Sequence, residues 1–513
     1  MSKPILPWNT LQLDGELSLL EQDRISHSED ASVHRLVPAA VAYPRTKRDL
    51  ERILAFCRLH SLPLHGWGAG TSRGGQPLGN GLTVDFRKYF HHILGFDEAS
   101  QELTVESGAL YSEVQKYLRA RGRSFPPDPS YHQCTIGGMV ANNAAGIHSV
   151  KYGGTASYIA AMEFLTSDGA WHQSDQPDAL TEKVQVFLKK NSFSDYPAVE
   201  KNSAGYALNR GLSAQGYLDL AQLLTGSEGT LGLFTEIRLR TVPLPTASSL
   251  GILYFESLES ACRAAMDLRS YEISACELVD KVLLDLHAAA TSEPKHAKKI
   301  SGNTFLDLFY EKKAEAILVV EIEGGSTSAA EKTLRQALGS VTSLDSRIAQ
   351  SPKESALIWD LRRHTSPILN RLENGKITIK PLWAVEDVSL PKENFLPYLT
   401  AQKALFTKHG LTCSFFGHAA SCNLHIDPIG IDPRLALQNE ELAALFDLVA
   451  EESYELVVRF GGSISGEHGD GIARTPFLKL QYPSSHRLFG PFKALFDPSG
   501  ILNPGKIVEV PHA

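Results

Sequence analysis

The sequence lacks the features that a membrane-spanning, secreted or nucleic-acid-binding protein requires. No apolar run approaches the roughly 18 residues of a membrane-spanning helix, and the opening stretch, MSKPILPWNTLQLDGE, has no signal-peptide core. The net charge of −8 provides no basic footprint for nucleic acid. We therefore expect a cytoplasmic protein without a transmembrane segment or a nucleic-acid partner. Peripheral docking to the inner face of a membrane remains an alternative.

Cysteine is scarce, and its spacing does not fit a metal cluster. The chain has six cysteines and no C-x-x-C pair: Cys57, Cys134, Cys262, Cys276, Cys413 and Cys422. This argues against an iron–sulfur cluster within the chain and favours free thiols in a reducing compartment. If the reaction needs an electron acceptor, we expect a separate partner, such as an iron–sulfur subunit, a cytochrome or a quinone.

The length and the pattern of elements indicate more than one structural unit. At 513 residues the chain is too long for one ordinary core. Thr46 and Asp49 form a capping box that starts a helix, and another short helix is expected around residues 17–24. Strands and helices alternate, which predicts an α+β or α/β architecture. The expected units are an N-terminal extension over 1–36, a first domain over 37–245, a second over 246–456 and a C-terminal segment over 457–513.

A glycine-rich stretch in the first domain suits the binding of a phosphate group. GWGAGTSRGGQPLG, residues 66–79, can turn several backbone N–H groups outward to form an anion-binding nest. It does not match the G-x-G-x-x-G dinucleotide fingerprint. Three further segments in this half share its small and amide residues: PPDPSYHQCTIGGMVANNAAG (126–146), KYGGT (151–155) and GSEGTLGLFTEIRL (226–239).

Two later stretches carry side chains suited to metal and proton chemistry. FGHAASCNLHID contains His418 and His425, and GGSISGEHGDGIAR contains Glu467 and His468. A straight strand would place the two histidines of the first stretch on opposite faces, but the small residues between them allow a turn. Three of the four groups suit one divalent metal, such as zinc, manganese or iron. The fourth can accept a proton beside it.

These motifs together resemble the vanillyl-alcohol oxidase superfamily of FAD-binding (PCMH-type) proteins. The segment KNSAGYALN, residues 201–209, is similar to its D-2-hydroxy-acid dehydrogenase branch. The resemblance implies an α+β fold with a two-subdomain FAD-binding unit and an α+β substrate (cap) domain containing an antiparallel sheet. It implies FAD held without a covalent bond, so His65 is expected to be an ordinary packed histidine.

The resemblance also assigns residues to the cofactor. It places the pyrophosphate at the loop Gly68–Ser72, the flavin and ribityl chain at Pro127–Ser130 and Gly137–Gly146, and the adenine at Gly226–Gly229. The implied cofactor-binding residues are Gly68, Ala69, Gly70, Thr71, Ser72, Gly75, Gln76, Pro127, Asp128, Pro129, Ser130, Gly137, Gly138, Asn142, Asn143, Gly146, Tyr152, Gly153, Gly226, Glu228, Gly229 and Asn503.

For the chemical half, the resemblance implies that His418, His425 and Glu467 bind the metal, that Asn423 lies beside the substrate and that His468 is the catalytic base. A substrate carboxylate also needs a cation, preferably the bidentate fork of arginine. The resemblance favours Arg362, with Ser366 one helical turn later. Lys380 is a second cationic candidate.

The leading hypothesis is the oxidation of a small D-2-hydroxy acid to the 2-oxo acid by hydride transfer to the flavin. D-lactate is the first choice of substrate, D-2-hydroxyglutarate the second and glycolate the third. One alternative is a flavin-using transferase similar to alkylglycerone-phosphate synthase, which would not need the histidines. Another is an electron-transfer subunit without chemistry of its own. The sequence leaves open whether the protein forms oligomers.

Overall fold

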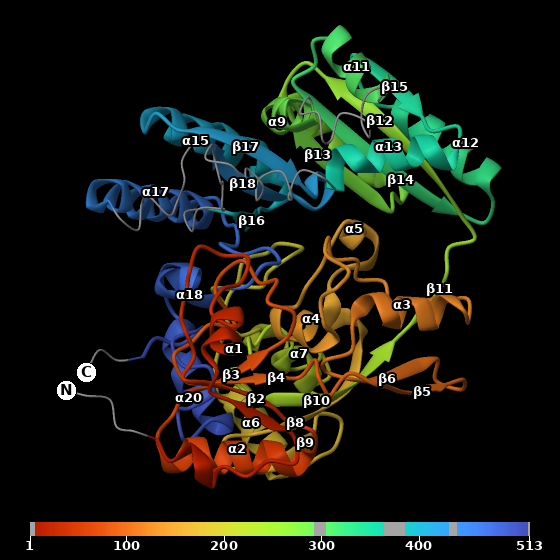
Figure 1. Ribbon diagram of the computed structural model, residues 1–513. Coiled ribbons are helices and arrows are strands. Elements are labelled where there is room, and N and C mark those ends of the chain that lie inside the picture. The colour runs from red at the N-terminus through yellow and green to blue at the C-terminus, as the bar shows by residue number, and fades with distance from the viewer. Residues whose placement is uncertain (1–5, 292–303, 364–384, 430–438, 511–513) are drawn as a thin grey trace.

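The computed structural model describes residues 6–291, 304–363, 385–429 and 439–510. Figure 1 shows two parts, one above the other, with the first half of the chain in the lower part. Among the described residues, no helix has the length and hydropathy that crossing a bilayer requires. The six cysteines form no disulfide, and five of them are buried.

The lower part begins with a small mixed sheet. Its strand order is β1 (Glu16–Ser18), β2 (Ala40–Tyr43), β4 (Leu82–Asp85) and β3 (Leu64–Trp67). Strands β2, β4 and β3 are parallel, and β1 is antiparallel to β2. Helix α2 (Lys47–Leu59) starts at the expected capping box of Thr46 and Asp49 and buries one apolar face.

The helix expected around residues 17–24 forms, but it begins later than predicted. Residues Glu16–Ser18 form β1, and helix α1 covers only Glu21–Ser26. The reason is tertiary, because pairing with β2 gives these backbone groups hydrogen-bond partners that a short isolated helix would lack. Propensity decides little in such a short segment.

A five-stranded antiparallel sheet completes the lower part. Its order is β5 (Ile93–Asp97), β6 (Glu102–Glu106), β10 (Leu233–Arg240), β8 (Ile159–Leu165) and β9 (Trp171–Gln173). The accompanying helices are α3 (Tyr111–Arg119), α4 (Ile136–Asn142), α5 (Ser149–Tyr152), α6 (Ala179–Lys190) and α7 (Leu220–Leu224). The chain leaves this part through β11 (Val242–Pro243), which pairs with β7 (Arg123–Ser124).

The upper part is built on a seven-stranded antiparallel sheet. Its order is β15 (Asp345–Ile348), β12 (Ala247–Phe255), β14 (Ala316–Gly324), β13 (Ala275–Asp280), β17 (Thr412–Gly417), β18 (Asn423–Ile429) and β16 (Asp387–Ser389). The helices of this part are α8 (Leu258–Leu268), α9 (Lys281–Thr291), α11 (Thr304–Glu311), α12 (Thr327–Gly339), α13 (Pro352–Arg363), α15 (Phe395–Lys408) and α17 (Glu440–Arg459). Both sheets with long strands are therefore antiparallel, as the sequence resemblance implied for the cap domain.

After α17 the chain crosses back to the lower part. Helices α18 (Gly471–Arg474), α19 (Leu478–Gln481) and α20 (His486–Phe496) follow, and Figure 1 shows α18 and α20 beside the first half of the chain. The Leu64 N–H donates to the Ile501 carbonyl at 2.8 Å, and the Asn503 N–H donates to the Leu64 carbonyl at 2.9 Å. The crossing segment 460–470 therefore lies where the two parts meet.

Candidate active site

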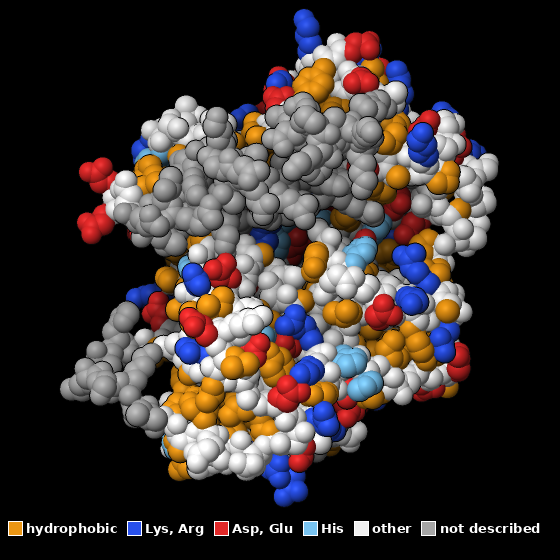
Figure 2. All heavy atoms as spheres, in the orientation of Figure 1, with side chains coloured by type: hydrophobic (Ala, Val, Ile, Leu, Met, Phe, Trp, Pro, Cys, Tyr) orange, Lys and Arg blue, Asp and Glu red, His pale blue; other side chains and the backbone are white. Residues whose placement is uncertain are grey.

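One cavity of about 520 Å³ lies between the two parts. Figure 2 shows a recess between them on the face turned to the viewer. The lower part lines the cavity with the loop after β3, the segment around α4 and the turn before β10. The opposite wall contains Arg362, Phe416, His425, Glu467 and His468. Residues more than 300 positions apart therefore face one space.

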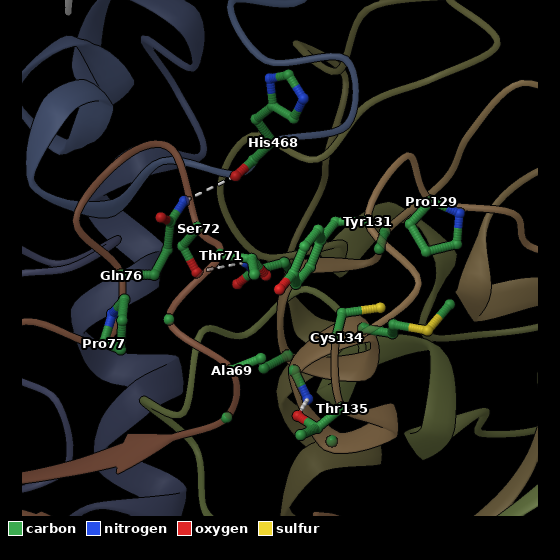
Figure 3. A pocket seen from close by; sticks show the side chains of 18 of the residues that line it. Ala69, Thr71, Ser72, Gln76, Pro77, Pro129, Tyr131, Cys134, Thr135 and His468 are labelled. Atoms are coloured by element: carbon green, nitrogen blue, oxygen red, sulfur yellow. Dashed lines mark hydrogen bonds between the residues drawn. The ribbon is translucent and has the colours of Figure 1, made fainter. Parts of the chain in front are cut away.

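Most of the predicted cofactor residues line this cavity. They are Gly68, Ala69, Gly70, Thr71, Ser72, Gln76, Pro129, Ser130, Gly137, Gly138, Asn142, Gly146, Glu228 and Gly229. Figure 3 shows Ser72 and Gln76 on the loop after β3, across from Tyr131 and Cys134 on the segment before α4. Backbone and small side chains dominate this wall, which lets a bound cofactor approach backbone N–H groups closely.

Two glycines of this wall are required by close packing. A Cβ at Gly68 would lie 2.5 Å from Thr135 Oγ1, and a Cβ at Gly137 would lie 2.7 Å from the Ser107 side chain. A larger residue at Gly68 would push the loop after β3 away from Thr135, and one at Gly137 would push α4 away from the end of β6. The packing of α4 against these two segments therefore depends on the glycines.

The other predicted cofactor residues do not line the cavity: Gly75, Pro127, Asp128, Asn143, Tyr152, Gly153, Gly226 and Asn503. Some of them support the residues that do. The Asn503 amide donates to the Gln76 carbonyl at 2.9 Å and to the Glu228 carbonyl at 2.6 Å. Its Oδ1 accepts a hydrogen bond of 2.8 Å from His65, which is buried and is not among the lining residues.

A hairpin brings together the two histidines of the stretch FGHAASCNLHID. Strand β17 ends at Gly417, a short turn follows, and Cys422 adopts a left-handed backbone conformation, with φ of 52°, immediately before β18. The rings of His418 and His425 are 5.5 Å apart, centroid to centroid. The turn that the small residues allow therefore does form, and it cancels the opposite-face geometry of a straight strand.

Glu467 lies at the centre of the histidines. Its Oε1 is 3.1 Å from His418 Nε2, 3.3 Å from His425 Nε2 and 3.7 Å from His468 Nε2. The rings of His425 and His468 are stacked at 4.8 Å. The structure thus brings together all four side chains that the sequence singled out.

The donor set fits a divalent metal. Ligand atoms of His418, His425 and Glu467 all lie within 4.8 Å of one another. The Nδ1 of His418 is 2.6 Å from Glu277 Oε1, an arrangement that leaves Nε2 available as a ligand. Burial lowers the pKa of His425 to about 4, so its ring is neutral, as a metal ligand must be.

A second possible set, Glu386, His425 and His468, is less suited to a metal. The Glu386 carboxylate already contacts Arg73 at 2.5 Å and Arg474 at 2.7 Å. It also contacts His468 Nδ1 at 2.7 Å. Because three cationic or hydrogen-bonding partners occupy this carboxylate, its arrangement suits orienting His468 better than binding an ion.

Buried acids fix the backbone and the rings of this wall. Asp387 Oδ2 accepts hydrogen bonds from the backbone N–H of Glu467 at 2.7 Å and of His468 at 2.9 Å. Burial alone would lower the pKa of His468, but the negative charges of Glu386 and Asp387 raise it. Burial alone would raise the pKa of Glu277, but His418 and Arg362 lower it to about 2.

Sequence reasoning missed these acids and one lysine. Glu277, Glu386 and Asp387 are buried carboxylates on or next to strands of the upper sheet. Their signal was an acidic residue inside an apolar strand, as in ACELVD and WAVEDVS, because such a residue needs a specific partner. Lys201, in the segment KNSAGYALN, contacts Glu467 Oε2 at 2.7 Å.

The predicted substrate residues are placed differently from one another. Arg362 lines the cavity, is buried, and donates from Nε to Glu277 Oε2 at 2.7 Å. Asn423 is fully buried and is not among the lining residues. Its Nδ2 donates to Asp387 Oδ1 and to the Val388 carbonyl, both at 2.8 Å. Ser366 and Lys380 lie outside the described residues.

One wall of backbone and small side chains thus faces a cluster of buried histidines and acids, an arrangement suited to an FAD-dependent oxidoreductase. Family models agree, with "FAD binding domain" matching residues 38–175 and "FAD linked oxidases, C-terminal domain" matching residues 244–507. The chain belongs to the FAD-linked oxidases. The family resemblance and the α+β fold expected from the sequence are thereby confirmed.

Several curated proteins are similar along the chain. A D-2-hydroxyglutarate dehydrogenase of Haemophilus influenzae is 27% identical and is matched over 96% of this chain. The chain spans about half the length of that relative, 50%. The glycolate oxidase subunit GlcD of Bacillus subtilis is 28% identical, with 94% of this chain and 92% of the relative covered. A D-lactate dehydrogenase of Anaerostipes hadrus is 27% identical, with the same two coverages of 94% and 92%.

Solved structures share the fold. An alkyldihydroxyacetonephosphate synthase superposes with a TM-score of 0.66 at 16% identity, covering 97% of this chain and 84% of the other. A 4-ethylphenol oxidase from Gulosibacter chungangensis, in complex with isoeugenol, gives a TM-score of 0.66 at 15% identity, covering 97% and 94%. These likenesses show the architecture, and the chemistry has to be inferred from the residues of this chain.

Proposed function

We propose that the protein oxidises a small D-2-hydroxy acid to the 2-oxo acid with FAD, and that D-lactate is its substrate. The observation that carries the proposal is the convergence of His418, His425 and His468 on Glu467, beside a cavity that His425, Glu467 and His468 line opposite the predicted cofactor residues. In this proposal, residues 37–245 hold FAD and residues 246–456 form the cap. Residues 457–513 carry Glu467 and His468 and return to the first domain.

The side chains divide the work of the reaction. His468 accepts the hydroxyl proton at Nε2, because its Nδ1 hydrogen is held by Glu386. Arg362, the cavity-lining arginine fixed by Glu277, orients the substrate carboxylate. His418, His425 and Glu467 hold a divalent metal, with zinc as the first choice. When bound, the metal lowers the pKa of the substrate hydroxyl, and FAD supplies the acceptor for the hydride.

The charges along the cavity favour a monocarboxylate. Among the described lining residues the arginines are Arg73 and Arg362. Arg73 contacts Glu386 at 2.5 Å and Asp427 at 3.8 Å, so its charge is already matched by two acids. Within the described lining, no further arginine is left for a second carboxylate, which supports D-lactate over D-2-hydroxyglutarate. The D configuration is taken from the relatives, which include the D-lactate dehydrogenase of Anaerostipes hadrus.

An anaerobic titration tests this function. The purified flavoprotein is mixed with D-lactate, L-lactate, D-2-hydroxyglutarate and glycolate, and the visible flavin band is followed. We expect D-lactate to bleach the band most rapidly and L-lactate to leave it unchanged, and we expect prior chelation to prevent bleaching. Bleaching that chelation does not affect would remove the metal from the proposal. No bleaching by any hydroxy acid would favour the transferase alternative.

The reduced flavin then needs an oxidant. We propose a separate partner or a quinone, consistent with the word "subunit" in the name of the Bacillus subtilis relative. Substrate-reduced protein should regain its colour faster with a soluble quinone than with dissolved oxygen. Faster recovery with oxygen would identify an oxidase instead.

A further inference from the structure

Lys201 connects the FAD-binding half to the metal ligands. It lies after α6, and its side chain is 8% exposed. Its ammonium group is 2.7 Å from Glu467 Oε2 and 3.1 Å from Asn423 Oδ1. Asn423 belongs to the sheet of the upper part, and Glu467 belongs to the segment that crosses between the parts. Lys201 therefore lies where three regions of the chain meet.

The two oxygens of Glu467 have different neighbours. Oε1 faces His418 and His425, whereas Oε2 is occupied by the ammonium group of Lys201. A carboxylate with one oxygen held by a charged donor presents only the other oxygen to a metal. Without Lys201, both oxygens would be free to bind the same ion.

The side-chain amide of Asn423 fixes the position of the Lys201 ammonium group beside Glu467. Both Nδ2 hydrogens of Asn423 are donated, one to Asp387 and one to the Val388 carbonyl. Its Oδ1 must then face Lys201, since a flipped amide would break two bonds and place its NH₂ against the ammonium group. Asp387 in turn holds the backbone of Glu467. A closed chain of hydrogen bonds thus fixes both Lys201 and Glu467.

We propose that Lys201 is a positioning residue that makes Glu467 bind the divalent metal through Oε1 alone and so keeps a coordination position open for the substrate. The inference rests on the proposed function, because it assumes the metal set of His418, His425 and Glu467. Catalytic metal sites need such an open position.

The test replaces Lys201 by methionine, which keeps an unbranched side chain, one atom shorter, and removes the charge and the donors. The control is Lys189→Met, because Lys189 is an exposed lysine of α6. Parent and variants are stripped of metal, loaded with cobalt(II) and compared at wavelengths beyond the flavin bands. FAD content and the thermal unfolding midpoint are recorded for each.

We expect Lys201→Met to retain FAD and to bind cobalt more tightly, by about 10-fold, because Glu467 gains a second ligand oxygen and a neighbouring positive charge is lost. We also expect weaker cobalt d–d absorption, because a bidentate Glu467 raises the coordination number. Lys189→Met should match the parent. An unchanged cobalt spectrum and affinity in Lys201→Met would overturn the role of Lys201 while leaving the proposed function intact. A parent protein that binds no cobalt would overturn both.

A second variant covers a failure of Lys201→Met to fold. Lys201→Gln keeps a donor that reaches towards Asn423 and lacks the charge that holds Glu467 Oε2. It should fold, bind FAD and show the same weakened cobalt absorption. If both variants lose FAD and cooperative unfolding, Lys201 is a structural ion-pair partner and the inference is wrong.

Discussion

The two walls of the cavity present different kinds of chemical group. The wall that contains the predicted cofactor residues, the cradle, consists largely of backbone and small side chains from contiguous motifs, such as the loop 66–79. The opposite wall carries ionisable side chains that come from separate segments, including Arg362, His425 and Glu467. A cofactor phosphate needs only N–H groups in a tight turn, whereas proton and metal chemistry needs charges held in fixed positions. A substitution in one wall should therefore impair the function of that wall and leave the binding function of the other wall unchanged.

His468→Gln is expected to show the largest difference between the two walls, with turnover lost and cofactor binding kept. The variant removes the proposed base, so turnover of D-lactate should fall by about 10²- to 10⁴-fold. FAD content and metal content should stay at the parent level, because the backbone of residue 468 is still held by Asp387. Steady-state kinetics with metal analysis measures this, and exposed His91→Gln is the control. Parent-like turnover in His468→Gln would remove His468 from the reaction.

Removing a metal ligand should have the next largest effect. Glu467→Gln loses the charge at the centre of the three histidines, and we expect metal affinity to fall by about 100-fold or more. The flavin spectrum should be unchanged, while bleaching by D-lactate should disappear. Added zinc at high concentration should partly restore bleaching. Normal bleaching by a Glu467→Gln protein without metal would show that the cluster is structural.

The reverse experiment damages the cradle. Gly137→Ala places a Cβ 2.7 Å from the Ser107 side chain, an overpacking that costs about 1–3 kcal/mol. If this overpacking destabilises the FAD-bound protein more than the apoprotein, FAD affinity should fall by about 10- to 100-fold. Cobalt or zinc binding should stay at the parent level. Fluorescence titration of the apoprotein with FAD measures the first quantity. A matched loss of metal binding would show that the two walls form one cooperative unit.

The same contrast explains what could be predicted from sequence. The cradle follows from contiguous motifs, and fourteen of its predicted residues line the cavity. The pairing of His418 with His425 followed from the small residues between them. Glu277 and Lys201 could not be placed, because they reach the cluster from segments distant in sequence and their own neighbours in sequence carry no metal or proton motif. The start of the helix expected around residues 17–24 was misplaced for a similar reason, since pairing with β2 makes residues 16–18 a strand.

The smallest expected effect concerns a contact between the two parts outside the cavity. His148 of the lower part lies 3.1 Å from Asp128 Oδ2 through Nδ1 and 2.8 Å from Glu321 Oε2, on β14, through Nε2. Burial alone would lower the pKa of His148, but these two carboxylates raise it from 6.5 to about 10. The protonated ring therefore bridges the FAD-binding half and the upper sheet by donating to an acid on each side.

This bridge should make stability depend on pH in one direction. Because the folded-state pKa of about 10 exceeds the ordinary 6.5, the stabilisation is complete below pH 6.5 and is lost as the pH rises past 10. We expect His148→Gln to lower the free energy of unfolding by about 1–2 kcal/mol at pH 6, a modest loss because water screens the exposed part of the ring. The loss should be much smaller at pH 10.5, where the ring is largely neutral. Thermal unfolding at both pH values measures this. The control is His132→Gln, which removes an exposed partner of Asp128 on the lower part alone. It should show no such dependence, and equal losses in both variants would mean that the bridge does not join the two parts.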